Sequence, residues 1–237
     1  MIDAYYQCFK QRGSLDYVLS QFRMYYPAAQ SKIILVNDGG DDFTAEAKKY
    51  DCEYFYKENV TKNTNLVFSE DLHLFEYVNR MGDNCKKFTN EYFILLEDDV
   101  LLLNPLSISS LGNDINGCNK NEFLGPRVSA EIRTHNEKLR NCFNIWYGAC
   151  GGSIFRTEFM VDLLKDKDAL KKEVSLYCSL SKKDKWASDC FLSYLCLKKN
   201  GTIGQYPGFC ETWYPDYLAR KQAGDIEVLH QYKELYI

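Results

Sequence analysis

The sequence predicts an α/β protein with a central, mainly parallel β-sheet flanked by helices, followed by a less regular second half. Short apolar runs alternate with segments whose apolar residues recur at helical spacing, which is typical of this class. Two of the apolar runs end abruptly in acidic or glycine-containing loops, as strands buried in a parallel sheet do. With 237 residues and 46% hydrophobic residues, the chain is long enough for one substantial core.

The first elements are expected to form a βαβ unit. Residues 2–9 are rich in aromatic and β-branched side chains and predict a strand. Residues 14–25 predict a helix that begins with Ser14 as its N-cap. The continuous apolar run at 32–36 then predicts a buried parallel strand that opens into a loop at 37–40.

The alternation continues through the remaining chain, although the second half is less regular. We find no internal repeat, low-complexity tract or linker, so one domain over residues 1–237 is expected. The further predicted elements are a helix at 43–50, a strand at 53–56, a helix at 67–81, a strand at 92–96, a turn-rich segment at 104–126, a strand at 143–147, a small-residue segment at 148–153, a helix at 157–166, a lysine-rich segment at 165–185 and a helix at 190–198.

Composition excludes several functional classes. The formal net charge of -4 offers no basic field for a polyanion, so nucleic acid is not an expected partner. The ten cysteines include no Cys-x-x-Cys pair, which argues against a structural zinc site, and we expect mostly reduced, buried thiols. No signal peptide or transmembrane segment is evident, which predicts a soluble, cytoplasmic protein. The sequons at Asn59 and Asn200 would matter only in a lumenal protein.

The most informative feature is the acidic triplet Glu97, Asp98 and Asp99, which directly follows the apolar run at 92–96. Three adjacent carboxylates repel one another and lose hydration when partly buried, and a bound cation compensates both costs. Carboxylate oxygens suit Mg²⁺ or Mn²⁺, which in turn bind the phosphates of nucleotides. An acidic surface turn is the alternative, but the apolar residues at 100–103 on the far side disfavour it.

The segment from Phe93 to Leu102 resembles the DxD-type motif of GT-A glycosyltransferases, in a Glu-Asp-Asp form similar to that of the family 25 enzymes. The resemblance implies a GT-A fold, Rossmann-like, with a nucleotide-sugar-binding half at 1–103 and an acceptor-binding half at 104–237. It also implies Asp99 as a direct ligand of Mn²⁺ or Mg²⁺. Asp98 and Glu97 would contact the donor's ribose or the metal and its waters.

The loop that begins at Asn37 and Asp38 is similar to the acidic loop of family 2 glycosyltransferases, where an aspartate holds the uracil or the ribose. The resemblance therefore implies that Asp38, with Asn37, binds the nucleotide. An ordinary Asn-Asp-Gly turn after a strand is the alternative for this segment.

A third match covers Gly151 and Gly152 and the segment beginning at Trp186, which resemble the family 2 pattern of a small-residue strand followed by an acidic residue that opens a helix. In inverting members that acidic residue is the general base, and Asp189 occupies its position. Ser188 stands where glutamate is usual, and a helix cap is the alternative role for Asp189. The two glycines would admit the donor sugar close to the backbone, or pack a tight strand crossing.

His230 resembles the C-terminal histidine that completes the metal shell in many GT-A enzymes. A structural histidine is the alternative. For the acceptor we expect stacking of sugar rings on aromatic side chains, with Trp146, Tyr147 and Trp186 as candidates.

The resemblance implies metal-dependent transfer of a sugar from a nucleotide-sugar, with UDP-sugars favoured, to a hydroxyl of a glycan or another acceptor, with inversion. Three alternatives stay open. These are a retaining transferase of the same fold, a sugar nucleotidyltransferase, and a non-catalytic carbohydrate-binding protein. The nucleotidyltransferase lacks support because no Gly-rich basic loop follows the first strand, and a carbohydrate-binding module would not need the buried acidic triplet.

Overall fold

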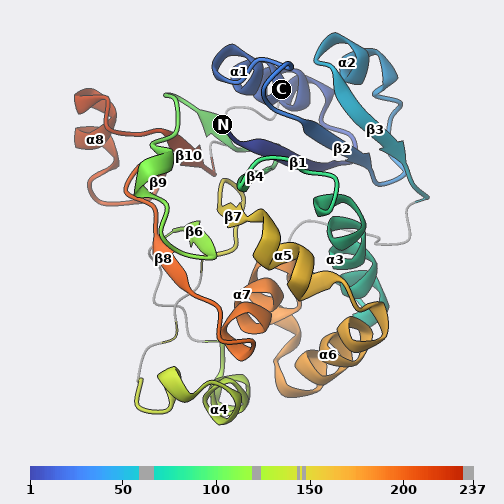
Figure 1. The fold of residues 1–237 in the computed structure, drawn as a ribbon, viewed down its shortest axis with the longest axis vertical. Coiled ribbons are helices and arrows are strands. Elements are labelled where there is room, and N and C mark those ends of the chain that lie inside the picture. The colour runs from blue at the N-terminus through green and yellow to red at the C-terminus, as the bar shows by residue number, and fades with distance from the viewer. Residues whose placement is uncertain (59–66, 119–123, 143–144, 146–147, 232–237) are drawn as a thin grey trace.

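A computed structural model describes residues 1–237 except 59–66, 119–123, 143–144, 146–147 and 232–237. Its main sheet has seven strands in the order β3-β2-β1-β4-β7-β6-β8, and a smaller sheet has the order β5-β10-β9 (Figure 1). The strands are β1 (Asp3–Cys8), β2 (Ile33–Asn37), β3 (Cys52–Tyr56), β4 (Tyr92–Leu96), β5 (Leu101–Leu102), β6 (Ile115–Gly117), β7 (Ile154–Arg156), β8 (Ile203–Gln205), β9 (Phe209–Glu211) and β10 (Val228–His230).

The helices lie on both faces of the main sheet. Figure 1 shows α1 and α2 on one side of β1 to β3, and α3, α5 and α6 on the other. The helices are α1 (Arg12–Tyr25), α2 (Thr44–Lys49), α3 (Asp71–Cys85), α4 (Pro126–His135), α5 (Thr157–Leu164), α6 (Lys167–Leu180), α7 (Ser188–Lys198) and α8 (Tyr217–Ala223), with short 3₁₀ turns at Ile108–Ser110, Glu137–Leu139 and Lys183–Lys185.

The first half is a parallel sheet built by crossover connections. Strand β1 pairs in parallel with both β2 and β4, and β2 pairs in parallel with β3. Because α1 and α2 move the chain outward from β1 while α3 returns it past β1, right-handed crossovers put them on opposite faces. All five residues of β2 and of β4 are buried, and all of them except Asn37 are apolar, as expected of strands inside a parallel sheet. The predicted α/β architecture with a mainly parallel central sheet is confirmed.

Helix α1 follows the predicted amphipathic spacing but begins earlier than expected. Leu15, Val18 and Phe22 are buried against the sheet, as their spacing predicts. The prediction of Ser14 as the N-cap was wrong. Ser14 is a buried residue inside the helix, and Gln11 occupies the cap position without a side-chain cap.

The second half adds antiparallel strands beside β4. Strand β7 pairs antiparallel with β4 and with β6, and the backbone of Gly152 and Ser153 continues this pairing along Leu95. In the smaller sheet, β10 lies between β5 and β9. Residues 1–103 and 104–237 both supply strands to the seven-stranded sheet, so the two predicted halves share one sheet. The assignment of a single domain stays a prediction.

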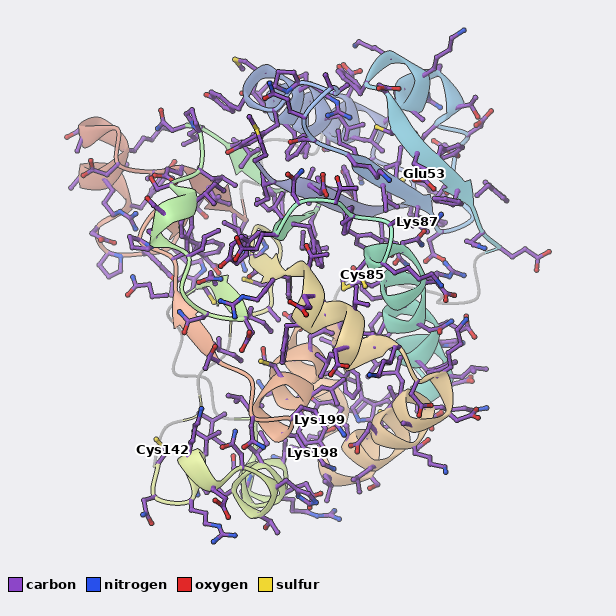
Figure 2. The ribbon with its side chains drawn as sticks, viewed as in Figure 1. Glu53, Cys85, Lys87, Cys142, Lys198 and Lys199 are labelled. Carbon is purple, nitrogen blue, oxygen red and sulfur yellow. The ribbon has the colours of Figure 1, made fainter. Side chains whose placement is uncertain are left out.

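One buried lysine in α7 forms ion pairs with α4 and α6. Helix α7 is almost wholly buried from Cys190 onward. At its end the ammonium of Lys198 lies 2.9 Å from a carboxylate oxygen of Glu173 in α6 and 3.2 Å from one of Glu131 in α4. Figure 2 labels Lys198 where these helices meet. The lysine-rich segment therefore contains a packed helix, α6, that the sequence analysis did not assign.

Two further expectations concern cysteines and membranes. All ten cysteines are free, and only Cys52 and Cys142 are not buried, in agreement with the expected reduced thiols. Among the described residues, no helix combines the length and the apolar character that crossing a bilayer would need.

Candidate metal and nucleotide-sugar site

The acidic triplet lies at the carboxyl end of β4, in the turn that leads to β5. The backbone N–H of Val100 donates to the carbonyl of Glu97 at 3.1 Å and closes the turn. Leu96 before the turn and Val100 after it are fully buried, so the three acids are fixed at the edge of the core. Ligands of open α/β sheets bind beyond the carboxyl ends of the strands, which is where this turn lies.

Strand pairing brings His230 to this turn from the end of the described chain. Strand β10 runs antiparallel to β5, with Leu229 opposite Leu101, so His230 lies next to the start of β5. Its Nε2 is 3.7 Å from Oε2 of Glu97 and 3.7 Å from Oδ1 of Asp99. One ligand atom from each of these three residues lies within 4.8 Å of the others.

Glu97, Asp99 and His230 fit a divalent metal ion. An ion bound at about 2.1 Å holds neighbouring ligand atoms roughly 3 to 4 Å apart, close to the spacing seen here. Two carboxylates and one imidazole suit Mn²⁺, and carboxylates suit Mg²⁺. Burial opposes protonation of His230, yet the neighbouring Cys150, Glu211 and Glu97 hold its pKa well above the ordinary value. The surroundings of the imidazole therefore favour positive charge.

Asp98 faces away from this group. Its Oδ1 accepts a hydrogen bond from the hydroxyl of Tyr6 in β1. Burial raises the pKa of Asp98 to about 6, and the charges of Glu97 and Asp99 add to the rise, while the Tyr6 hydrogen bond opposes it. The structure thus brings Glu97 and Asp99 together with His230 and leaves Asp98, expected as a metal or ribose contact, on the β1 side.

The loop after β2 is hydrogen-bonded to the end of β1, where the backbone N–H of Asp38 donates to the carbonyl of Cys8 at 2.8 Å. The amide of Asn37 donates to the hydroxyl of Tyr54 at 2.8 Å, and its carbonyl accepts from the backbone of Gly40 at 2.9 Å. Asp38 forms a buried ion pair with Arg80 of α3. Both residues expected to bind nucleotide therefore have partners within the protein.

Cys8, at the end of β1, lies between the acidic loops that follow β2 and β4. Burial raises the pKa of the Cys8 thiol, and the charges of both Asp98 and Asp38 raise it further. The loops that follow β2 and β4 therefore meet at the same end of the sheet.

The two glycines of the small-residue segment have different neighbours. A Cβ atom on Gly151 would lie 2.5 Å from Oε2 of Glu97, so this glycine makes room for a carboxylate of the acidic group. A Cβ on Gly152 would lie 2.6 Å from Cγ1 of Val228, and its φ of +81° favours glycine. Gly152 therefore permits close packing between the two sheets.

Asp189 lies in the first turn of α7 and is half-buried. Its Oδ1 accepts from the backbone N–H of Cys190 at 2.6 Å, although the N-cap position belongs to Ala187. Tyr77 of α3 connects this helix end with the acidic loops. Burial raises the pKa of Tyr77, the charge of Glu97 is the next cause, and Asp189 and Asp38 contribute as well. Acids from three separate segments therefore act on the pKa of one buried hydroxyl.

Of the three expected acceptor contacts, only Trp186 can be placed. It is half-buried just before α7, and among the described residues its buried indole N–H has no hydrogen-bond partner. Trp146 and Tyr147 lie outside the described residues.

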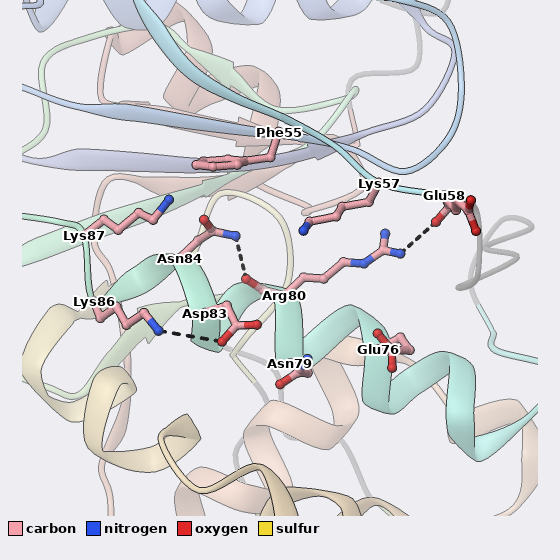
Figure 3. Close-up of a pocket in the computed structure, with 10 residues that line it drawn as sticks. All are labelled: Phe55, Lys57, Glu58, Glu76, Asn79, Arg80, Asp83, Asn84, Lys86 and Lys87. Atoms are coloured by element: carbon pink, nitrogen blue, oxygen red, sulfur yellow. Dashed lines mark hydrogen bonds and ion pairs between the residues drawn. The ribbon is translucent and has the colours of Figure 1, made fainter.

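A cavity of about 360 Å³ lies between α3 and the end of β3 (Figure 3). Arg80 crosses it and donates to the carbonyl of Glu58 at 2.8 Å, while Lys87 places its ammonium 3.6 Å from the ring centre of Phe55. Glu97, Asp99 and His230 are not among its lining residues. The cavity thus borders Arg80, the partner of Asp38, rather than the acidic group.

Sequence reasoning did not identify four residues that interact with the candidate site, three by direct contact and Tyr77 electrostatically. Tyr77 shares the buried face of α3 with Leu74 and Val78, so its spacing marked it only as a core residue. Tyr6, Arg80 and Glu211 gave no local signal, because their partners are more than 18 residues away in the chain.

Comparison with known proteins gives a structural likeness only. No protein-family model matches the sequence, and no curated protein matches it. A solved structure of the galactosyltransferase LgtC in complex with donor and acceptor sugar analogues is similar over 99% of this chain and 95% of that chain, with a TM-score of 0.59 and 9% identity. An active-site mutant of LgtC is similar over 97% and 86%, with a TM-score of 0.59 and 10% identity.

A third similar structure is the bifunctional glycosyltransferase WbbM, with a TM-score of 0.54 and 8% identity, over 97% of this chain and 45% of that chain. At such identities the likeness concerns the fold. The chain adopts the GT-A glycosyltransferase fold.

Proposed function

We propose that this protein transfers a sugar from a nucleotide-sugar, with UDP-sugars favoured, to a hydroxyl of a glycan or another acceptor. Mn²⁺ or Mg²⁺ would be bound by Glu97, Asp99 and His230. The observation that carries the proposal is the convergence of these three side chains at the carboxyl end of β4. The similarity to LgtC, which was solved with donor and acceptor sugar analogues, supports the same class of reaction.

Each residue has a distinct role in this reaction. The bound metal would supply Lewis acidity to the departing diphosphate. Glu97, Asp99 and His230 would hold this metal ion, and Gly151 leaves space for the Glu97 carboxylate. Tyr6 orients Asp98, which we assign to the donor's ribose. Asp38, oriented by Arg80, remains our candidate for the base or ribose, together with Asn37.

For the chemical step we propose direct displacement at the anomeric carbon with Asp189 as the general base. The acceptor oxygen forms a bond to that carbon, the bond to the diphosphate oxygen breaks, and Asp189 takes the hydroxyl proton. Glu97 and Asp189 both raise the pKa of the buried Tyr77, after the larger effect of burial, so both acids act electrostatically on one side chain, which agrees with this assignment. Trp186, two residues before α7, is the candidate surface for the acceptor.

A retaining transferase of the same fold is the second candidate. One observation favours it: Oδ1 of Asp189 accepts a backbone N–H of its own helix, which suits a residue that orients substrate or stabilises the helix end. The configuration of the product from a donor of known configuration decides between the two.

A donor screen tests the proposal. Purified protein is incubated with a panel of UDP-, GDP- and other nucleotide-sugars, with Mn²⁺ or with EDTA, and release of the nucleotide is measured. We expect metal-dependent hydrolysis of at least one donor, abolished by Asp99→Asn. Asp162→Asn is the matched control, because Asp162 is an exposed surface residue. Release that continues in EDTA, or that Asp99→Asn leaves unchanged, would contradict the proposed metal site.

A further inference from the structure

The two ring nitrogens of His230 face different carboxylates. Nε2 faces Glu97 and Asp99, each at 3.7 Å, and Nδ1 is 3.3 Å from Oε1 of Glu211. The contact between Nδ1 and Glu211 is a buried hydrogen bond. Strands β9 and β10 pair in parallel with Glu211 directly opposite His230, so the backbone register sets this contact.

Glu211 is a buried acid, and each of its carboxylate oxygens forms a hydrogen bond. Glu211 is 2% exposed, and an unpaired carboxylate at such a buried position would destabilise the fold. Oε1 interacts with Nδ1 of His230, and Oε2 accepts a hydrogen bond from the indole N–H of Trp213. The Trp213 hydrogen bond fixes the rotation of the carboxylate, so Oε1 stays directed at the imidazole.

We propose that Glu211 is a positioning residue whose carboxylate accepts a hydrogen bond from the Nδ1–H of His230 and thereby leaves the Nε2 lone pair for the metal ion. A neutral imidazole carries one proton, so an acceptor at Nδ1 selects the tautomer whose Nε2 can bind a metal. Carboxylates that orient metal-binding histidines in this way raise metal affinity about 10- to 100-fold. This inference rests on the proposed function, in which His230 is a metal ligand.

A different use of the same carboxylate competes with this role. Ligand atoms of Cys118, Cys150 and Glu211 also lie within 4.8 Å of one another in the core. Two sulfurs and one carboxylate would suit Zn²⁺. The hydrogen bonds to His230 and Trp213 already occupy both oxygens of Glu211, which favours the positioning role.

The decisive variant is Glu211→Gln, because Trp213 controls how the new amide can lie. The indole N–H must face an acceptor, so the amide oxygen turns to Trp213 and the amide nitrogen turns to His230. The amide then donates to Nδ1 and moves the imidazole proton to Nε2, where it blocks the metal. We expect Mn²⁺ affinity, measured by calorimetry, to fall about 10- to 100-fold.

Trp213→Phe supplies the matched rescue. It removes the N–H from a half-exposed side chain, so in the double variant Glu211→Gln with Trp213→Phe the amide can flip and present its oxygen to His230. Mn²⁺ affinity should then recover in part, although the stability lost by each substitution is not restored. A purely structural role for Glu211 predicts no such recovery.

The tautomer provides a readout that does not depend on metal or activity. Nitrogen-15 NMR of the histidines, at a pH where the imidazole is neutral, should show His230 protonated at Nδ1 in the wild type and at Nε2 in Glu211→Gln. The signal is assigned by its absence in His230→Ala. An Nε2-protonated imidazole in the wild type would overturn the inference, whatever the metal data show.

The remaining outcomes separate this inference from the proposed function. If His230→Ala keeps full Mn²⁺ affinity, the proposed metal ligand is wrong. If His230→Ala weakens binding but Glu211→Gln does not, only the positioning role is wrong. Stoichiometric zinc in the purified protein that is lost in Cys150→Ser would assign Glu211 to a zinc site and overturn the positioning role as well.

Discussion

At the scale of single residues, Asp189 decides which mechanism applies. Asp189→Asn keeps the size of the side chain and an oxygen that can accept the Cys190 N–H, but it cannot take a proton. If Asp189 is the general base, turnover should fall by roughly 10²- to 10⁴-fold while donor affinity hardly changes. Near-normal turnover, or a product that retains the donor's configuration, would move the enzyme to the retaining alternative.

Gly151 and Gly152 offer a second comparison between adjacent residues. In Gly151→Ala the new Cβ meets the flexible end of Glu97, so the carboxylate moves and the fold persists. We expect weaker Mn²⁺ binding with little change in stability. In Gly152→Ala the Cβ meets Val228 in the core at a positive φ, and the free energy of unfolding should fall by about 1–3 kcal/mol.

Calorimetry with Mn²⁺ and urea denaturation measure the two effects on both variants. A stability loss in Gly151→Ala as large as that in Gly152→Ala would show that the two glycines serve the same packing role. It would also remove the assigned link between Gly151 and the metal site.

At the scale of elements, Arg80 joins α3 to the loops that follow β2 and β3. It pairs with Asp38 and donates to the carbonyl of Glu58, and the side chains of Arg80 and Asp38 are only 7% and 6% exposed. Replacing both members of a buried ion pair by apolar residues often changes the stability of a protein little. Removing only one member is strongly destabilising, because it takes away the main counter-charge of a buried group. The pair therefore fixes the geometry of the acidic loop after β2.

Arg80→Met should accordingly cost about 3–5 kcal/mol in the free energy of unfolding, measured by urea denaturation. Arg140→Met is the control, because the ion pair that Arg140 forms with Glu137 is exposed, and its loss should cost about 0–1 kcal/mol. Equal costs in the two variants would show that Asp38 finds another cationic or hydrogen-bonding partner.

The elements that could be predicted are those whose apolar residues form a continuous run or a regular period in the sequence. Strand β4 and helix α1 carry continuous or periodic apolar residues, so the chain's local pattern indicates both. Helix α6 has buried residues at helical spacing, including Leu170, Val174 and Tyr177, but the sequence analysis assigned this stretch only as part of a lysine-rich segment. Strands such as β9 and β10 have three residues each, too few for a period, and they exist because of tertiary pairing.

In the candidate site, too, some residues could be predicted from the sequence and some contacts could not. The acidic triplet and His230 could be proposed from the sequence by resemblance, and the structure brings Glu97, Asp99 and His230 together. The orientation of Asp98 toward Tyr6 and the contact between Glu211 and His230 depend on which strands lie side by side. Local sequence carries no information about such pairs, so these contacts could not be predicted.

At the scale of the whole molecule, the site joins the middle and the end of the described chain. The seven-stranded sheet supplies the turn after β4, and the smaller sheet supplies His230 through β10. A metal ion between Asp99 and His230 would therefore connect the two sheets. Because such an ion binds only the folded protein, it should raise the stability of the whole fold.

The most direct test is thermal denaturation with UDP, in Mn²⁺ or in EDTA. The acidic group repels a bare diphosphate, so UDP should stabilise the wild type only with the metal, by about 2.7 kcal/mol at a concentration of 100 Kd. Asp99→Asn should fold normally and lose this metal-dependent shift. Equal stabilisation by UDP in EDTA, or an undiminished shift in Asp99→Asn, would contradict the metal site at Glu97, Asp99 and His230.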